Sequence, residues 1–217
     1  CESDLAQSDL TRPLRVTLIS PKGPLYRHSG GIFKKSLRYQ PLTLTTLTAL
    51  APKDMDIAFT LIDEGIEEFA KNDIQLVWQT GKLYITEAAK AVAAYEGKGI
   101  KTMPFISKMD YAYAVADVVV SRAGAMSVSE LSIAGKPTIF IPLPSAAEDH
   151  QTKNAMALVN HKAALLVTDS EAKEKLIPMV IELVQNEEEQ KKIATNVLKM
   201  AFSDSANIIA DEVLKLI

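Results

Sequence analysis

Residues 117–154 alternate between apolar and polar segments in an order that restricts the fold more than any other part of the sequence. A short apolar run, DVVV, is followed by the small residues of SRAGA, a helix-like segment, a second apolar run and a polar loop. Parallel strands need a helical crossover between them, so this order predicts a β-α-β unit of a parallel sheet. Further strand-like runs lie on both sides. The sequence therefore predicts an α/β protein with a doubly wound, Rossmann-like parallel sheet covered by helices on both faces.

The hydrophobic patterns and the glycine and proline positions divide this part of the chain into elements. The expected strands are residues 74–79, 100–105, 118–121, 138–142 and 164–168. The expected helices are residues 86–95, 108–116, 127–134, 151–160, 171–185, 187–200 and 205–216.

The charge balance argues against nucleic acid as a partner. Lys and Arg number 24 against 27 Asp and Glu, a net charge of −3, whereas a phosphate-backbone binder needs a dominant positive surface. No apolar run reaches the roughly 18 to 20 residues needed to cross a bilayer, so we expect no transmembrane segment. Cys1 is the single cysteine, which excludes an intramolecular disulfide and argues against a cysteine-based metal site. We therefore expect a cytoplasmic protein without a metal.

The N-terminal third has a different character. Residues 15–20 predict a strand, followed by a long loop rich in glycine, proline and cationic residues, a helix at 43–50 and a strand at 57–62. Over residues 15–68 the strings SPKGPLYRHSGGIFKKSLRYQPLTLTTL and TLIDEGIE resemble the first β-α-β unit of the flavodoxin-like, cobalamin-binding domain in front of many radical S-adenosylmethionine enzymes. The later Asp-x-His-x-x-Gly and cysteine-cluster motifs of those proteins are absent. We therefore expect neither cobalamin nor an iron–sulfur cluster, and no other cofactor.

The small residues that follow the strand at 118–121 suit a phosphorylated ligand. Small side chains let the backbone approach a diphosphate, and the free N–H groups and dipole of a helix start favour its negative charge. An ordinary strand-to-helix turn explains the same residues equally well.

Glu130 lies three residues after Ser127, one turn into the same expected helix. Its carboxylate can reach the side of the helix that would face a ligand, where it suits two ribose hydroxyls, as in dinucleotide-binding folds. Taken by itself, Glu130 is better explained as a capping-box partner of Ser127. The sequence leaves both interpretations open.

The polar loop after the strand at 138–142 brings together side chains that suit a sugar. Pro142 fixes the exit of that strand, and His150, Gln151 and Asn154 follow it. Open α/β sheets bind ligands at the carboxyl ends of their strands, where amide and imidazole groups can contact sugar hydroxyls. His150 could also be a general base or a metal ligand, but no second His or Cys stands at metal-ligand spacing.

Four strings together give a specific resemblance. FISKM, ADVVVSRAGAMSVSEL, GKPTIFIPLP and DHQTKNA occur in the order and spacing of the C-terminal domain of the MurG family, bacterial glycosyltransferases that add N-acetylglucosamine to lipid I. The resemblance covers residues 73–217. It implies one half of a GT-B glycosyltransferase, with UDP-N-acetylglucosamine as the donor and a role in peptidoglycan synthesis, cell-wall biogenesis and cell division.

The resemblance also implies a role for each matching position. The uracil would meet the backbone of Ile106, and Met109 would lie over the nucleotide. The start of the helix at 125–127 would hold the diphosphate, Glu130 the ribose, and the polar loop the sugar. The complete set of donor-binding residues is Ile106, Met109, Ala125, Met126, Ser127, Glu130, His150, Gln151 and Asn154.

Two glycine-rich motifs of that family are missing from the sequence. The GGTGGH-type loop, whose histidine is the usual candidate for the catalytic base, and the GGSxGA loop are both absent, and the glycines at 30–31 do not match either. An inverting transfer needs a base to deprotonate the acceptor hydroxyl, so the catalytic residue is unassigned. Lipid I is expected as a partner only if an acceptor domain is supplied.

The two resemblances describe a composite chain. Residues 1–70 would form a flavodoxin-like β-α-β segment whose strand at 15–20 completes the sheet of a UDP-sugar-binding domain at 73–217. Such a join could be a natural fusion, an error in a gene prediction or deliberate. Three functions remain open: an N-acetylglucosaminyltransferase or its donor half, a uridine nucleotide-sugar-binding module without transfer, and a chimeric flavodoxin-like domain without transferase activity. The family's lipid substrate adds peripheral association with the inner face of the plasma membrane to the expected cytoplasmic location.

Overall fold

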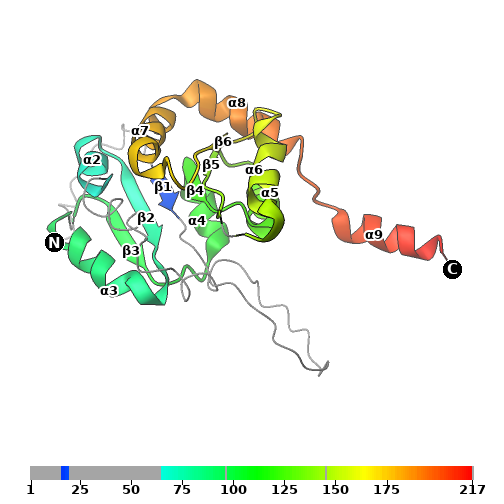
Figure 1. The fold of residues 1–217 in the computed structure, drawn as a ribbon, viewed down its shortest axis with the longest axis horizontal. Helices are drawn as coiled ribbons and strands as arrows, with labels where there is room; N and C mark the ends of the chain where they lie inside the picture. Colours follow the sequence, from blue (N-terminus) through cyan, green and yellow to red (C-terminus); the bar gives the residue numbers. More distant parts are fainter. Residues whose placement is uncertain (1–15, 20–64, 96, 145, 217) are drawn as a thin grey trace, which may run out of the picture.

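A parallel six-stranded sheet forms the centre of the domain (Figure 1). The computed structural model describes residues 16–19, 65–95, 97–144 and 146–216. The strand order is β3-β2-β1-β4-β5-β6, and every neighbouring pair is parallel. The strands are β1 (Val16–Ile19), β2 (Gln75–Gln79), β3 (Ile100–Met103), β4 (Val118–Ser121), β5 (Thr138–Phe140) and β6 (Leu165–Leu166). The doubly wound α/β fold is confirmed.

Eight α-helices are found in the described part of the chain. They are α2 (Ile66–Lys71), α3 (Gly81–Val92), α4 (Met109–Val115), α5 (Ala125–Ala134), α6 (His150–Val159), α7 (Ala172–Gln185), α8 (Glu187–Leu198) and α9 (Ser205–Leu214). Two 3-10 turns, η2 (Ala93–Tyr95) and η3 (Ala147–Asp149), follow α3 and precede α6.

The alternation of side chains along β4 divides the core into two layers. Val118 and Val120 belong to a cluster that includes buried residues of α2, α3 and α7, whereas Val119 belongs to a cluster with residues of α4, α5 and α6. Successive residues of a strand point to opposite faces of a sheet, so an unbroken apolar strand is covered by helices on both sides. Helix α8 contributes Ile193 to the first cluster and Val197 to the second.

The strand expected at 15–20 is β1, which lies between β2 and β4. Its backbone pairs in register with both neighbours, from Val16 with Gln75 to Ile19 with Trp78 on one side and from Thr17 with Val118 on the other. The helix expected at 43–50 and the strand expected at 57–62 lie outside the described residues, as does most of the stretch that resembles a cobalamin-binding domain. The division of the chain at residues 70–73 stays a prediction.

Two helices begin earlier than the sequence predicted. Helix α3 starts at Gly81, before the helix expected at 86–95, and Gly81 adopts a φ of +74° where the chain turns from β2 into the helix. Helix α5 starts at Ala125, two residues before the expected Ser127, with Gly124 as its N-cap. Helix α9 lies close to its expected range but projects from the body of the domain and buries none of its residues (Figure 1).

Gly135 ends α5 in the left-handed conformation, with a φ of +64°. A Cβ at this position would lie 2.9 Å from Cγ and Cδ2 of Leu198 in α8. Gly97 is also left-handed, with a φ of +87°, but a Cβ there would meet nothing within 4 Å.

These two glycines give a matched test of the α5–α8 contact. Both Gly135→Ala and Gly97→Ala incur the left-handed backbone strain of about 1–2 kcal/mol. Gly135→Ala is expected to lower the free energy of unfolding by about 1 kcal/mol more, because the new methyl group must displace Leu198. Urea denaturation of both variants measures the difference, and the additional Leu198→Ala substitution should remove it. Equal losses would show that the end of α5 is not packed against α8 in this way.

Candidate nucleotide-sugar site

The loops that carry the expected donor-binding residues all leave the same edge of the sheet. Ile106 follows β3, the residues around Gly124 follow β4, and the loop before α6 follows β5. Because all strands are parallel, their carboxyl ends lie together. The strand order reverses between β1 and β4, and this switch point is where doubly wound sheets open a crevice for a ligand.

The loop after β3 is fixed to the end of β2. The backbone N–H of Ile106 donates to Oε1 of Gln79 over 2.8 Å, and the Gln79 side chain is buried, with 1% exposed. The Ile106 N–H is therefore already paired, so a ligand at this residue's backbone could use only the Ile106 carbonyl, as an acceptor. Gln79 is not among the residues expected from the sequence, although a glutamine at the end of an apolar strand is a signal for such a bond, since a buried amide needs a partner.

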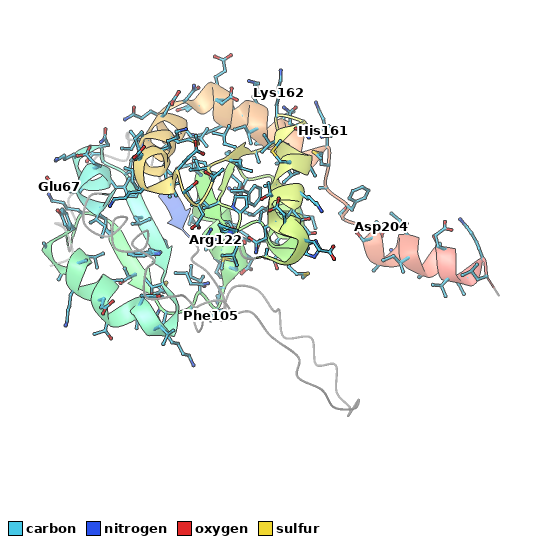
Figure 2. The ribbon with its side chains drawn as sticks, in the orientation of Figure 1. Glu67, Phe105, Arg122, His161, Lys162 and Asp204 are labelled. Carbon is cyan, nitrogen blue, oxygen red and sulfur yellow. The ribbon has the colours of Figure 1, made fainter. Side chains whose placement is uncertain are left out.

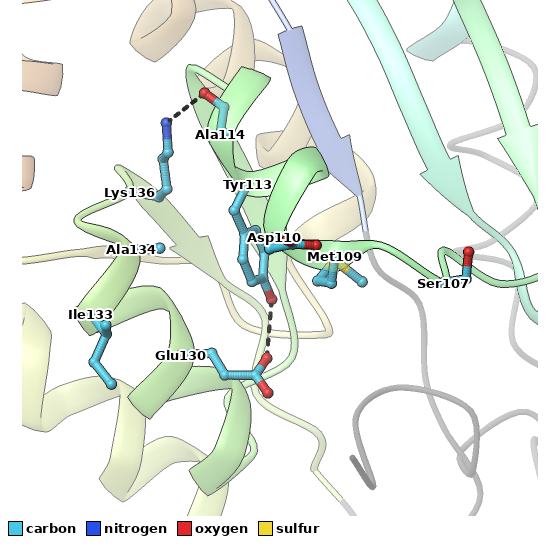
Figure 3. Close-up of a pocket in the computed structure, with 9 residues that line it drawn as sticks. All are labelled: Ser107, Met109, Asp110, Tyr113, Ala114, Glu130, Ile133, Ala134 and Lys136. Atoms are coloured by element: carbon cyan, nitrogen blue, oxygen red, sulfur yellow. Dashed lines mark hydrogen bonds between the residues drawn. The ribbon is translucent and has the colours of Figure 1, made fainter. Parts of the chain in front are cut away.

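Glu130 does not cap its own helix. Its Oε2 accepts a hydrogen bond from the hydroxyl of Tyr113 in α4 over 3.4 Å (Figure 3). Burial raises the pKa of the Glu130 carboxyl above its ordinary value, and the Tyr113 hydrogen bond partly opposes that shift. The capping-box interpretation is therefore wrong, because the carboxylate reaches across to α4 and not back to the start of α5.

A pocket of about 590 Å³ lies between α4 and α5 beside this pair (Figure 3). Two of the expected residues, Met109 and Glu130, line it together with Tyr113, Ile133 and Lys136. The other expected residues do not line this pocket and lie along the loops that follow β3, β4 and β5.

The N-terminus of α5 carries no side-chain cap. Gly124 is extended, with φ −65° and ψ 148°, and its carbonyl accepts the first helical bond, from the Val128 N–H. Ala125 and Met126 are exposed, and Ser127 is nearly buried. The N–H groups of the first helical turn, which have no partner within a helix, thus lie at the carboxyl edge of the sheet, where an anion would be favoured.

Two amide side chains after β5 are oriented by backbone groups. Oε1 of Gln151 accepts from the Leu143 N–H over 3.0 Å, and Nδ2 of Asn154 donates to the Ala123 carbonyl over 3.1 Å. The Leu143 N–H can pair only with the amide oxygen of Gln151, and the Ala123 carbonyl can pair only with the amide nitrogen of Asn154. The other end of the Gln151 amide is therefore a donor, and the other end of the Asn154 amide is an acceptor. His150, the first residue of α6, is exposed.

Arg122 stands in the loop after β4 but is directed into the protein (Figure 2). Its Nη1 donates to the carbonyls of Ile141 and Pro142 over 3.0 and 3.1 Å, and to Oδ1 of Asp169 over 2.6 Å. Burial lowers the pKa of the Arg122 guanidinium, and the charge of Asp169 opposes that shift. This cation therefore joins the chain segments that follow β4, β5 and β6, and its long-range partners are not visible in any local sequence pattern.

Neither a metal site nor a spanning helix is found in the structure that is described. Across residues 16–19, 65–95, 97–144 and 146–216, no three His, Cys, Asp or Glu side chains are grouped so that they could hold a metal ion. Among the helices of the same residues, none is both long enough and apolar enough to cross a membrane.

The parallel sheet and its helices define an open, doubly wound α/β domain of the Rossmann-like class. The family model described as "Glycosyltransferase family 28 C-terminal domain" matches residues 55–209, well over half of the chain. The chain belongs to this family.

Curated relatives and solved structures agree with that membership. The chain is 51% identical over 154 residues to an enzyme of Phocaeicola vulgatus named UDP-N-acetylglucosamine–N-acetylmuramyl-(pentapeptide) pyrophosphoryl-undecaprenol N-acetylglucosamine transferase, covering 70% of this chain and 41% of that protein. It is 43% identical over 190 residues to the enzyme of the same name from Bacteroides thetaiotaomicron, covering 86% of this chain and 50% of that protein. The chain thus spans about half the length, or less, of these relatives.

The crystal structure of Acinetobacter baumannii MurG shares the fold, with a TM-score of 0.69 at 21% sequence identity over 95% of this chain and 51% of that one. Glycosyltransferase VinC, solved with DTDP, aligns with a TM-score of 0.56 at 14% identity over 91% of this chain and 39% of that one. The chain therefore has the architecture of one Rossmann-like half of a GT-B glycosyltransferase.

The Arg122–Asp169 pair should be far more important for stability than ion pairs on the surface. Asp169→Ala leaves a guanidinium whose side chain is only 11% exposed without its counter-charge, and we expect a loss of about 3 kcal/mol in the free energy of unfolding. Glu189→Ala breaks the Lys192–Glu189 pair on α8, whose side chains are 50% and 33% exposed, and should lose less than about 1 kcal/mol. Chemical denaturation compares the two variants; losses of similar size would contradict the role given to Arg122.

Proposed function

We propose that this chain is the donor-binding half of an inverting N-acetylglucosaminyltransferase of peptidoglycan synthesis and that it binds UDP-N-acetylglucosamine. The observation that carries the proposal is the position of Glu130. Its carboxylate lies one turn into a helix whose N-terminus has no side-chain cap, and it lines the pocket beside the loop that follows β3. A carboxylate next to an anion-binding helix start suits a ribose joined to a diphosphate.

The remaining parts of the donor fit the groups around Glu130. The Ile106 carbonyl can accept the N3–H of uracil, and Met109, which lines the pocket, would lie over the nucleotide. The diphosphate would bind the first N–H groups of α5, at Ala125, Met126 and Ser127.

The sugar would bind at the start of α6. A hydroxyl group both donates and accepts, and Gln151 and Asn154 offer one donor and one acceptor. His150 stands exposed at the same helix start and would contact the sugar beside Gln151.

The acceptor half of the reaction would come from the part of the relatives that this chain does not span. Their name states that N-acetylglucosamine is transferred to a pyrophosphoryl-undecaprenol-linked muramyl pentapeptide. Transfer to that lipid needs a base to deprotonate the acceptor hydroxyl, and no residue here is assigned that role. We therefore infer donor binding by this chain and transfer only with an acceptor domain, at the inner face of the plasma membrane.

Substitution of Glu130 tests the ribose contact. Glu130→Gln keeps the shape of the side chain and removes the charge, so we expect UDP-N-acetylglucosamine to bind about 10-fold to 100-fold more weakly, the usual effect of losing hydrogen bonds to a charged group. Isothermal titration calorimetry measures the affinity, with Glu188→Gln on α8 as the control that should bind like the unchanged chain. Absence of binding by the unchanged chain at millimolar ligand would overturn the proposed function itself.

A charge placed at Ala125 separates stability from diphosphate binding. Ala125→Asp should raise the free energy of unfolding by about 0.3–1 kcal/mol, since an anion in the first helical turn is favourable. The same charge should repel the diphosphate and weaken UDP binding by about 10-fold or more, while uridine, which has no phosphate, binds as before. Ala125→Asn is the neutral control of similar size. If UDP and uridine lose affinity equally, the diphosphate does not bind at this helix start.

A further inference from the structure

The strongest feature without an assigned role is the hydroxyl of Tyr113. The tyrosine comes from α4 and Glu130 from α5, and the two side chains point toward one another at the pocket wall (Figure 3). The side chain of Tyr113 is only 8% exposed and belongs to the apolar cluster that includes Leu131 and Phe140. The packing fixes the ring, so the hydroxyl is held at one place beside the carboxylate.

The Tyr113 hydroxyl donates to the Glu130 carboxylate over 3.4 Å. Burial, with a further contribution from the negative charge of Glu130, raises the pKa of Tyr113 well above its ordinary value. An ionised carboxylate has no proton to give, so in this hydrogen bond the phenol is the donor and Glu130 the acceptor. One lone pair of Oε2 is used in this way, which leaves Oε1 and the second lone pair of Oε2 as acceptors.

The charged groups near the Glu130 carboxylate do not donate a hydrogen bond to it. Lys136 lines the same pocket, but its ammonium donates to the carbonyls of Ala114 and Ala116 at the end of α4 (Figure 3). Asp110 also lines the pocket and is exposed, and a carboxylate accepts hydrogen bonds and offers no donor to Glu130. Within the described part of the chain, Tyr113 is the donor whose hydrogen bond orients the Glu130 side chain.

We propose that Tyr113 is a positioning residue that orients the Glu130 carboxylate for the two vicinal hydroxyls of a ribose, and so sets the preference of the site for ribonucleotides over 2′-deoxyribonucleotides. The inference rests on the proposed donor-binding function. A glutamate side chain has three rotatable bonds, and holding it in one rotamer costs conformational entropy. When Tyr113 holds the carboxylate in advance, both of its oxygens are ready for the cis-diol before the ligand arrives. A 2′-deoxyribose offers one hydroxyl and gains less from this arrangement.

Tyr113→Phe, which keeps the ring and removes only the hydroxyl, tests the proposal. Calorimetric titration with UDP and with 2′-deoxy-UDP gives the affinity ratio for the unchanged chain, Tyr113→Phe and Glu130→Gln. We expect the unchanged chain to prefer UDP by about 10-fold or more, and Tyr113→Phe to lose about 3-fold to 10-fold in UDP affinity with little change for 2′-deoxy-UDP. The control is Tyr111→Phe, an exposed tyrosine on the same helix, which should keep both affinities.

The outcomes distinguish the inference from the function on which it rests. If the unchanged chain binds neither nucleotide, the proposed function fails. If it prefers UDP and Tyr113→Phe retains the same ratio, the function stands and the positioning role of Tyr113 is overturned, even if the variant is less stable.

The pH dependence of UDP binding gives a second, independent measurement. The Tyr113 hydrogen bond stabilises the charged form of Glu130, so its removal should raise the pKa of that carboxyl further. The carboxyl is then protonated at a higher pH, and the decrease in UDP affinity on acidification should begin at a higher pH in Tyr113→Phe than in the unchanged chain. Ionisation of the ligand's own phosphates is common to both proteins and cancels in the comparison. Coincident pH profiles would contradict the proposal, because a purely structural tyrosine would leave the profile where it was.

Discussion

The backbone pairing of β1 with both β2 and β4 is the constraint on which the rest of the domain depends. Without this strand, the pair β3-β2 and the trio β4-β5-β6 would have no common hydrogen-bonded partner. The proposed site draws on both groups, since Ile106 follows β3 while Glu130 and Gln151 follow β4 and β5. The relative position of the loop that would bind the base and the helix that would hold the diphosphate therefore depends on the four residues of β1.

Buried polar contacts then give each loop its orientation. Gln79 holds the peptide of Ile106, Tyr113 holds the carboxylate of Glu130, and the Leu143 N–H holds the amide of Gln151. Arg122 connects the segments that follow β4, β5 and β6, and its guanidinium is directed at protein groups and not at the proposed site. A ligand would thus meet groups whose donors and acceptors are already fixed by the protein, which reduces the cost of ordering them on binding.

The sequence predicted the parts of this arrangement that depend on local order. The apolar run before residue 121, the small residues at 123–125 and the helix that carries Glu130 are close together in the chain, and hydrophobic periodicity describes such segments well. Tyr113 and Arg122 were not found, because each acts through a partner 17 to 47 residues away. Their role depends on how α4 packs on α5 and how β6 lies beside β5, and neither is visible in a local pattern. The capping interpretation of Glu130 was wrong for the same reason, because its local partner Ser127 is three residues away, whereas its partner in the structure, Tyr113, lies on another helix.

The bond between Gln79 and the Ile106 N–H has a consequence for how the site could diverge. In the proposed function a base would meet the peptide carbonyl of Ile106, and every amino acid would supply the same carbonyl at that position. Codon changes at position 106 would therefore alter the size and polarity of the neighbouring side chain while leaving the hydrogen-bonding face unchanged. The base preference of such a domain would change only when the backbone of the loop after β3 moves, for example through substitution of Gln79 or an insertion in that loop. It should therefore be far more resistant to point mutation than the preference for the sugar.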